Sequence, residues 1–360
     1  MKKRILRTLD LQYYCFVVDE RPLCIWDIDL KKRSIDFLDS LDPEYYEFIA
    51  DNALAVITKE EDEKNKQAQR AALLLRFTYS QALETHFALI MSAIQATRCV
   101  PAWINEYKTS ELYNLVRKII NHKPILSHTD KESLSWQRIY EALFDCIVCE
   151  DTETKNAIRK AVANLWSQLG SDFLDEGFRE EYNFIKHGFR AHSGGFYVAI
   201  GTTKKSGASS NNMSMLGKSN FGTSYLANRR IGDHKDHVIL ENNNRNWDPE
   251  NIANKLRLIS LSISNVVSAL KLFNGSPANE VHIHWPKDIN QIDGLLNKSN
   301  INGLASMSSI DAMVRPDFID PFSKSQIIKN YKDGKFIGIK HVEFEDWRLD
   351  YIEEMEKNNK

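Results

Sequence analysis

The sequence predicts a mainly α-helical protein with β-rich segments near its middle and its ends. Three observations support this fold class. Apolar residues recur at helical spacing over long stretches, helix start and stop signals flank those stretches, and alternation with a period of two is confined to short runs. The chain has 360 residues, of which 42% are apolar, so it is long enough to bury one large core or two smaller ones.

The first 57 residues are predicted to form a β-rich module. Short runs of β-prone residues at 13–18, 23–28 and 35–38 alternate with polar turns. A helix is expected to begin at Asp42-Pro43, because proline is tolerated in the first helical turn. We expect this module to be appended to the helical part of the chain, which is predicted to occupy residues 58–275.

The helical part is predicted to begin with a long helix. Thr58 and Glu61 have the spacing of a capping box, apolar residues follow at helical offsets, and Cys99-Val-Pro101 ends the helix. A last strong helix is expected to begin at Asp248, followed by a proline in its first position, and to end before Gly275. Further helices are predicted between these two, at 110–120, 131–148, 152–169 and 171 to about 192.

A β-hairpin with a polar loop is predicted to interrupt the helical bundle at about 196–245. Its strands are expected at 196–200 and 238–240, and the tract between them is rich in Ser, Asn, Gly and Lys. A C-terminal α+β extension is expected over 276–360, with strands at 281–285 and 336–342. The predicted fold is therefore a helical bundle with an inserted hairpin and small α+β extensions at both ends.

The overall charge excludes one broad class of protein. Lys and Arg number 47 against 49 Asp and Glu, for a net charge of −2, which argues against a generally basic nucleic-acid-coating protein but leaves a local basic site open. The charge-free stretch 85–97 is shorter than the roughly 20 residues that span a bilayer. The five cysteines are scattered except for Cys146-Ile-Val-Cys149. This pair is expected to pack at the end of a buried helix, and a redox motif or half of a zinc site is the alternative interpretation. We expect a cytoplasmic protein without membrane contact.

One helical stretch concentrates side chains that suit phosphate chemistry. On a helical wheel Arg179, Asn183, Lys186, His187 and Arg190 fall within about 100° of arc, beside a separate apolar stripe. The three cations would hold a phosphate, the amide would make a fixed hydrogen bond, and the imidazole would transfer a proton near neutral pH. This set suffices in kind for metal-free RNA cleavage by attack of the 2′-hydroxyl. A solvated basic helix face is the alternative interpretation.

The run Asn183-Phe-Ile-Lys-His187-Gly, late in a helix of an all-α bundle, resembles the HEPN superfamily of helical toxin-like and nucleic-acid-processing proteins. Members commonly carry an Arg, a polar residue directly after it, and a His a few residues later. The resemblance implies a HEPN-like bundle, a homodimer, and metal-independent endoribonuclease activity without a cofactor. It also implies a place in a toxin–antitoxin or phage-defence system, with an antitoxin or another protein as partner. His187, Asn183 and Arg179 would then be the catalytic residues.

The sequence departs from the HEPN pattern at the position before Asn183. That residue is Tyr182, whereas Arg179 lies one turn earlier, with seven residues between it and His187. Two hypotheses follow. In the first, Arg179 supplies the missing charge from the same helix face and the protein cuts RNA. In the second, the chain is a non-catalytic member that binds RNA or another protein. The resemblance covers roughly residues 60–195, with 251–273 as a further helix.

A second basic region lies in the predicted insertion. Residues 201–232 contain no Asp or Glu, so the tract would either contact phosphates as a flexible arm or form a solvated loop. Its basic residues are Lys204, Lys205, Lys218, Arg229 and Arg230. Four of these residues, together with Lys186 and Arg190 of the helix, are candidate phosphate-binding residues. The four are Lys204, Lys205, Arg229 and Arg230.

Histidine pairs and one acidic residue complete the set of candidates. His282 and His284 would project from one face of the predicted strand, and residues 233–237 carry two further histidines and two aspartates, but neither group has an identified completing ligand. The sequence therefore assigns no metal or cofactor. Glu84 lies among apolar residues of the first long helix, as either a buried acid that faces the basic stripe or an acid on the helix surface.

Overall fold

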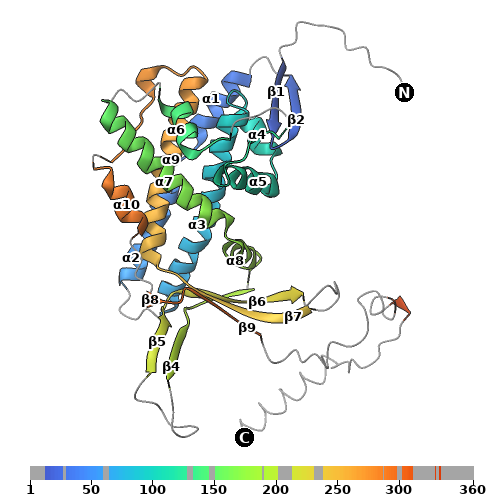
Figure 1. The fold of residues 1–360 in the computed structure, drawn as a ribbon, viewed down its shortest axis with the longest axis vertical. Coiled ribbons are helices and arrows are strands. Elements are labelled where there is room, and N and C mark those ends of the chain that lie inside the picture. Colours follow the sequence, from blue (N-terminus) through green and yellow to red (C-terminus); the bar gives the residue numbers. More distant parts are fainter. Residues whose placement is uncertain are drawn as a thin grey trace, which may run out of the picture. The chain divides into compact units, whose positions relative to one another are not determined.

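The computed structural model describes a mainly helical protein, which confirms the predicted class (Figure 1). The chain divides into two compact units, one made of residues 1–226 and 243–308 and the other of 227–242 and 309–360. The helices α1 to α10 lie in the first unit, whereas Arg229, Arg230 and residues 233–237 belong to the second. The structure describes residues 13–26, 30–59, 65–127, 133–145, 151–188, 190–201, 213–230, 238–286, 288–297 and 302–310, together with 329, 332 and 333.

The N-terminal elements are a β-hairpin followed by two helices. Strands β1 (Tyr13–Val18) and β2 (Arg21–Trp26) pair antiparallel, close to the predicted positions. Helix α1 (Leu30–Ser40) replaces the strand predicted at 35–38, which is therefore wrong. Leu30, Ser34 and Leu38 are all buried at intervals of four residues, so a helical face decides the structure of this short apolar run.

The boundary between the next two helices also differs from the prediction. Helix α2 (Tyr45–Lys59) includes Thr58 in its last turn, so the predicted capping box there is wrong. Helix α3 (Lys66–Gln95) begins instead after Asn65, whose side chain accepts a hydrogen bond from the backbone N–H of Gln67 at 2.8 Å. An asparagine cap therefore marks the start of the longest helix.

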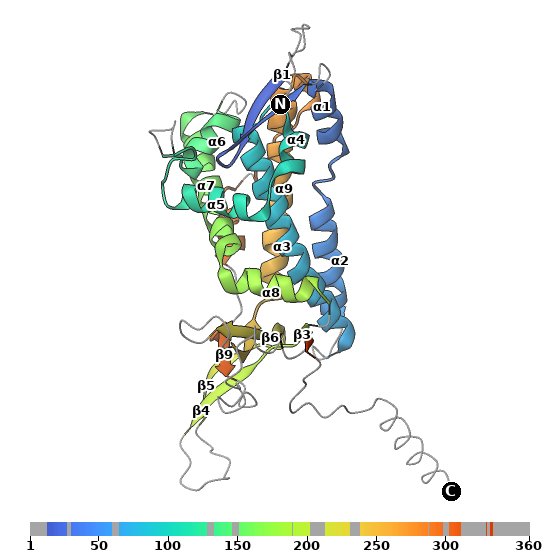
Figure 2. The same cartoon turned by 90° about the vertical axis from the view of Figure 1, so that its right-hand side faces the viewer.

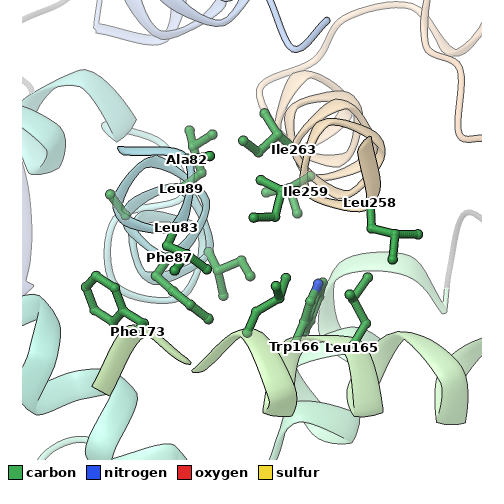
Figure 3. Close-up of a cluster of buried hydrophobic side chains, with 14 of the residues drawn as sticks. Ala82, Leu83, Phe87, Leu89, Leu165, Trp166, Phe173, Leu258, Ile259 and Ile263 are labelled. Carbon is green, nitrogen blue, oxygen red and sulfur yellow. The ribbon is translucent and has the colours of Figure 1, made fainter. Parts of the chain in front are cut away.

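Helices α2, α3 and α9 (Pro249–Phe273) run alongside one another and form the centre of the bundle (Figure 2). Helix α7 (Thr152–Leu174) packs against α3, and side chains from α3, α7 and α9 meet in the core (Figure 3). The labelled core residues include Leu83 and Phe87 of α3, Trp166 of α7, and Ile259 and Ile263 of α9. One hydrophobic cluster extends from Phe16 to Leu296.

Helix α9 begins and ends where the sequence predicts. The Asp248 side chain accepts a hydrogen bond from the backbone N–H of Glu250 at 3.0 Å, and Pro249 occupies the first position. Gly275 has a φ of 92°, and the N–H groups of Gly275 and Ser276 donate back to Leu272 and Lys271, which completes a Schellman motif. The helix is long and apolar enough to cross a membrane, but 67% of its most apolar stretch is buried in the protein.

The remaining helices of the bundle are α4 (Val100–Glu106), α5 (Thr109–Ile120), α6 (Trp136–Phe144) and α8 (Glu176–Lys186). The predicted break near residue 170 is wrong, because α7 continues through Gly170, where a larger residue would crowd Ile120 at 3.1 Å. The break falls instead at Asp175. The helix predicted to reach about residue 192 ends at Lys186.

The predicted hairpin insertion contributes strands to two sheets. One has the order β3-β6-β7-β9 and the other β4-β5-β8. Residues 281–286 form no strand, contrary to the prediction; Asn265 and Ser268 of α9 hydrogen-bond the backbone of His284 and His282 instead. The residues predicted as a strand at 336–342 lie outside the described part. The remaining bounds are β3 (Ala191–Ser193), β4 (Tyr197–Gly201), β5 (Met213–Lys218), β6 (Gly222–Arg230), β7 (Val238–Asn246), α10 (Asn290–Asn297), β8 (Asn302–Gly303) and β9 (Ser306–Ile310).

Candidate functional site

Helix α8 carries the predicted polar stripe and runs across the direction of α3 and α9 (Figure 2). It begins at Asp175, whose carboxylate accepts a hydrogen bond from the backbone N–H of Phe178 at 2.5 Å. Phe178 is buried and packs against Tyr79 of α3, with the ring centroids 5.6 Å apart. The apolar side of α8 is thus fixed on the bundle, which leaves the polar stripe at the edge of the contact.

A buried carboxylate beside the apolar stripe also anchors α8. Glu181 is fully buried, and its Oε2 lies 2.6 Å from Nη2 of Arg76 on α3. Its Oε1 accepts a hydrogen bond from the hydroxyl of Thr223 on β6. Arg245 of β7 lies 4.0 Å from Glu181 and 2.9 Å from Asp175. These contacts hold α8 in a fixed position between α3 and the strands.

Sequence reasoning missed Glu181, although a signal for it exists. On the helical wheel this residue falls within about 20° of the apolar stripe, so a carboxylate there is expected to be buried and paired. Its partners Arg76 and Arg245 are more than 60 residues away in the chain, and a helical pattern carries no information on such distant pairs. The prediction therefore found the polar stripe but not its anchor.

A pocket of about 320 Å³ opens beside the polar stripe. We call it the α8 pocket. Helix α8 contributes Arg179, Asn183 and Lys186, which are three of the five residues of the predicted stripe. The other walls come from α3 and α5 and from aromatic rings: Ser80, Glu84, Thr109, Ser110, Tyr113, Phe173, Phe178 and Tyr182.

Aromatic rings position the two cations of the pocket. The half-buried Arg179 guanidinium lies 5.2 Å from the ring centroid of Tyr113, which itself stacks on Phe173 at 4.2 Å. Burial raises the pKa of Tyr113 to about 12, so this phenol stays neutral at physiological pH. Lys186 is exposed, with its Nζ 5.9 Å from the ring centroid of Tyr182. Neither cation has a carboxylate partner within the residues that the structure describes.

The pocket also contains one acid. Glu84 is half-buried, and its Oε1 accepts hydrogen bonds from the hydroxyls of Tyr107 at 3.3 Å and Thr109 at 3.1 Å. Burial, followed by the charge of Glu84, raises the pKa of Tyr107 well above its usual value, so Tyr107 remains a hydrogen-bond donor. Of the two alternatives for Glu84, an acid that faces the basic stripe is the one observed. Its Oε2 is a second acceptor at this site.

The other two residues of the predicted stripe do not line the pocket. His187 is exposed and forms the C-cap of α8, and Gly188 follows in the left-handed region with a φ of 61°. Arg190 comes after this turn, outside the helix and exposed. The wheel placed both residues on the stripe because it assumed that the helix continued to about residue 192, and the end of α8 at Lys186 removes that basis.

The remaining predicted residues lie mostly outside the described side chains. This holds for Lys204, Lys205 and residues 233–237, and for the side chains of Arg229 and Arg230 in β6. Cys146 and Cys149 are outside as well. His282 and His284 are exposed with their rings 5.9 Å apart, but no group of three or more His, Cys, Asp or Glu residues in the described part could hold a metal ion.

The fold and the site define a mainly helical protein with one pocket of mixed charge. Two cations, Arg179 and Lys186, line this pocket, and each lies next to an aromatic ring. Comparison with known proteins finds no matching family model, no matching curated protein and no matching solved structure.

Proposed function

We propose that this chain is a HEPN-like protein that binds RNA, with a backbone phosphate held in the α8 pocket. The observation that carries this proposal is the convergence of Arg179, Asn183 and Lys186 on one pocket in which both cations lack a carboxylate partner among the described residues. A homodimer and a partner protein such as an antitoxin remain parts of the proposal that derive from the resemblance alone, and cytoplasmic location remains an expectation from the sequence pattern.

The chemistry of the pocket suits a phosphate on one side. The guanidinium of Arg179 presents a planar set of donors for phosphate oxygens, and its contact with Tyr113 restricts its orientation before binding. Lys186 adds a mobile second cation at the exposed rim, and Asn183 adds an amide donor. Two cations beside one phosphate make the affinity depend on salt.

The opposite side of the pocket suits a ribose or a base. Glu84 repels a phosphate but accepts a hydrogen bond from a 2′-hydroxyl or a base N–H. The 2′-hydroxyl distinguishes RNA from DNA, so this carboxylate favours RNA. Tyr182 supplies an aromatic ring in the same pocket for contact with a base. The pocket is therefore proposed to take one nucleotide of a single-stranded segment.

The test compares two double variants in binding to a fluorescent single-stranded RNA. We expect Arg179→Ala/Lys186→Ala to weaken binding at least about tenfold and to lower the slope of log affinity against log salt by about 0.7, the contribution of one phosphate contact on a single strand. The control is Arg117→Ala/Lys123→Ala, which removes an exposed Arg and an exposed Lys away from the pocket. Equal losses in both double variants would remove the proposal.

Cleavage of RNA is the second candidate function. The observation that favours it is the imidazole of His187, which is exposed directly after Lys186 and has no side-chain hydrogen bond within the described residues. In this version Lys186 and Arg179 hold the phosphate and His187 transfers a proton. We expect His187→Ala to abolish product ends that carry a cyclic phosphate, with no effect of EDTA, while the exposed His192→Ala control still cuts. If wild-type protein bound RNA without making such ends, the cleavage function would be excluded and only the binding function would remain.

A further inference from the structure

Two cysteines face each other across the N-terminal hairpin. The register of β1 and β2 places Cys15 directly opposite Cys24, and their Sγ atoms are 3.5 Å apart. Both residues are exposed, whereas Cys99 is buried. The two thiols therefore form a pair that solvent can reach, and the scattered spacing of cysteines in the sequence gives no sign of it.

The exposed face follows from the alternation along β1. Phe16 and Val18 point into the core, with 6% and 0% of their surface exposed. Cys15 directly precedes the inward-pointing Phe16 and therefore projects from the opposite face of the strand. Because residues that are paired across antiparallel strands share a face, Cys24 projects to the same side.

The register that pairs the cysteines is fixed by contacts of the turn. Asp19, which has a φ of 53°, and Glu20 form a two-residue turn between the strands. The carboxylates of Asp19 and Glu20 accept from Lys118 Nζ of α5 at 2.8 and 2.7 Å, and Asn114 donates to Asp19 at 2.7 Å. A slip of one residue would break these contacts and turn the cysteines to opposite faces.

The strands themselves are also attached to the bundle. Trp103 Nε1 of α4 donates to the backbone oxygen of Val17, two residues after Cys15, at 3.1 Å. Arg21 donates to both carboxylate oxygens of Glu111 on α5 at 3.2 and 3.3 Å. The hairpin thus holds the two sulfur atoms close to each other in the reduced protein.

We propose that Cys15 and Cys24 are a dithiol site that reacts with low-molecular-weight disulfides and closes to an intramolecular disulfide across the hairpin. Directly opposite strand positions have Cα separations of about 4.5 to 5.5 Å, within the range that a disulfide spans. Closure therefore requires rotation of the side chains and leaves the strand pairing in place.

The reaction balances as two exchange steps. The Cys15 thiol loses its proton, its sulfur attacks one sulfur of the small disulfide, and the first small thiol leaves with that proton. The Cys24 thiol then loses its proton and attacks the Cys15 sulfur of the mixed disulfide, which releases the second small thiol. Two protein thiols are oxidised to one disulfide, and one small disulfide is reduced to two thiols.

The two sulfur atoms already interact in the reduced protein. Their hydrogen bond is the main cause that raises the pKa of the Cys24 thiol. The two exchange steps balance equally when the roles of Cys15 and Cys24 are exchanged.

The experiment uses the full chain with Cys146→Ser and Cys149→Ser, which leaves three thiols. After incubation with glutathione disulfide, we expect an intact mass lower by about 2 Da, the two hydrogens lost on closure. Cleavage after Glu20, which lies between the two cysteines, should then yield two peptides joined through Cys15 and Cys24. The buried Cys99 is the internal control and should stay free, and dithiothreitol should restore the original mass.

Single variants separate a reactive pair from two independent thiols. In Cys15→Ser and in Cys24→Ser the remaining cysteine should keep a mixed disulfide with glutathione, because no partner resolves it. In the protein with both thiols that adduct should decay at least about tenfold faster, since the second attack is intramolecular. Two stable adducts on the protein with both thiols, or two thiols that remain free, would overturn the proposal.

Discussion

His86 shows how one residue couples the core of the bundle to pH. Its side chain is fully buried on α3, and its Nε2 lies 2.9 Å from Oγ of Ser262, which also accepts from Trp166 Nε1 at 2.8 Å. Burial lowers the pKa of His86 from 6.5 to about 3, so the folded protein holds the neutral imidazole. The unfolded chain binds a proton in the pH range between these two values, and the folded chain does not.

The stability of the protein is therefore expected to fall as the pH drops below the unfolded pKa of His86. The contribution is complete above pH 6.5 and decreases toward pH 3, with a loss of about 2 kcal/mol between pH 7 and pH 5 from this residue. In urea unfolding, the free energy of unfolding of His86→Leu should fall between pH 7 and pH 5 by about 2 kcal/mol less than that of the wild type. The exposed His282→Leu should keep the wild-type dependence. An unchanged slope in His86→Leu would contradict the assignment.

At the scale of one element, the position of α8 depends on the buried charges around Glu181. Replacing this residue with Gln would leave Arg76 and Arg245, whose side chains are 11% and 20% exposed, without their shared carboxylate. Breaking a buried ion pair by removing one partner costs about 3 kcal/mol or more. We expect Glu181→Gln to lower the free energy of unfolding by about this amount and to weaken RNA binding, because the α8 pocket loses its support. Glu176→Gln, which is exposed in the first turn of α8, is the matched control and should cost less than about 1 kcal/mol.

The elements also show which parts of the fold can be predicted from sequence. Local signals suffice for α9, where Asp248, Pro249 and Gly275 cap the helix by contacts within a few residues. They fail where tertiary packing determines the secondary structure. In α1, burial of one helical face favours a helix although the sequence contains a short β-prone run. Local signals fail also at Gly170, which lies inside α7 where the lack of a side chain leaves room for Ile120 of α5.

The candidate site also contains residues that local sequence signals predict and residues whose positions depend on tertiary contacts. Arg179, Asn183 and Lys186 are placed together by helical spacing alone, and the structure brings them to one pocket. His187 and Arg190 depend on where α8 ends, which the turn at Gly188 determines. The pairing of Cys15 with Cys24 requires the register of the hairpin, and contacts of the turn with α5 fix that register.

At the scale of the whole molecule, the N-terminal elements share the hydrophobic cluster of the bundle. Phe16 and Val18 of β1 belong to the same cluster as the central residues of α3, α7 and α9. Cys99 lies where these parts meet, since it precedes α4, which contacts β1, α1 and α3. The thiol of Cys99 is 3% exposed, and burial raises its pKa to about 11. A thiol reagent can reach it only after this junction opens.

The labelling of Cys99 therefore tests whether the chain unfolds as one body. In a variant that keeps Cys99 as the only cysteine, we expect maleimide labelling to rise at the same urea concentration at which the helical circular dichroism signal falls, because opening the junction disrupts the shared core. Trp103 and Trp166, both buried, give a third signal through fluorescence, which should follow the same curve. If Cys99 became reactive at lower urea, while the helical signal persisted, the first 57 residues would unfold as an independent module. In that case the cluster that joins β1 to the bundle would contribute little to stability, and Cys99 protection would report only on the local packing of α4.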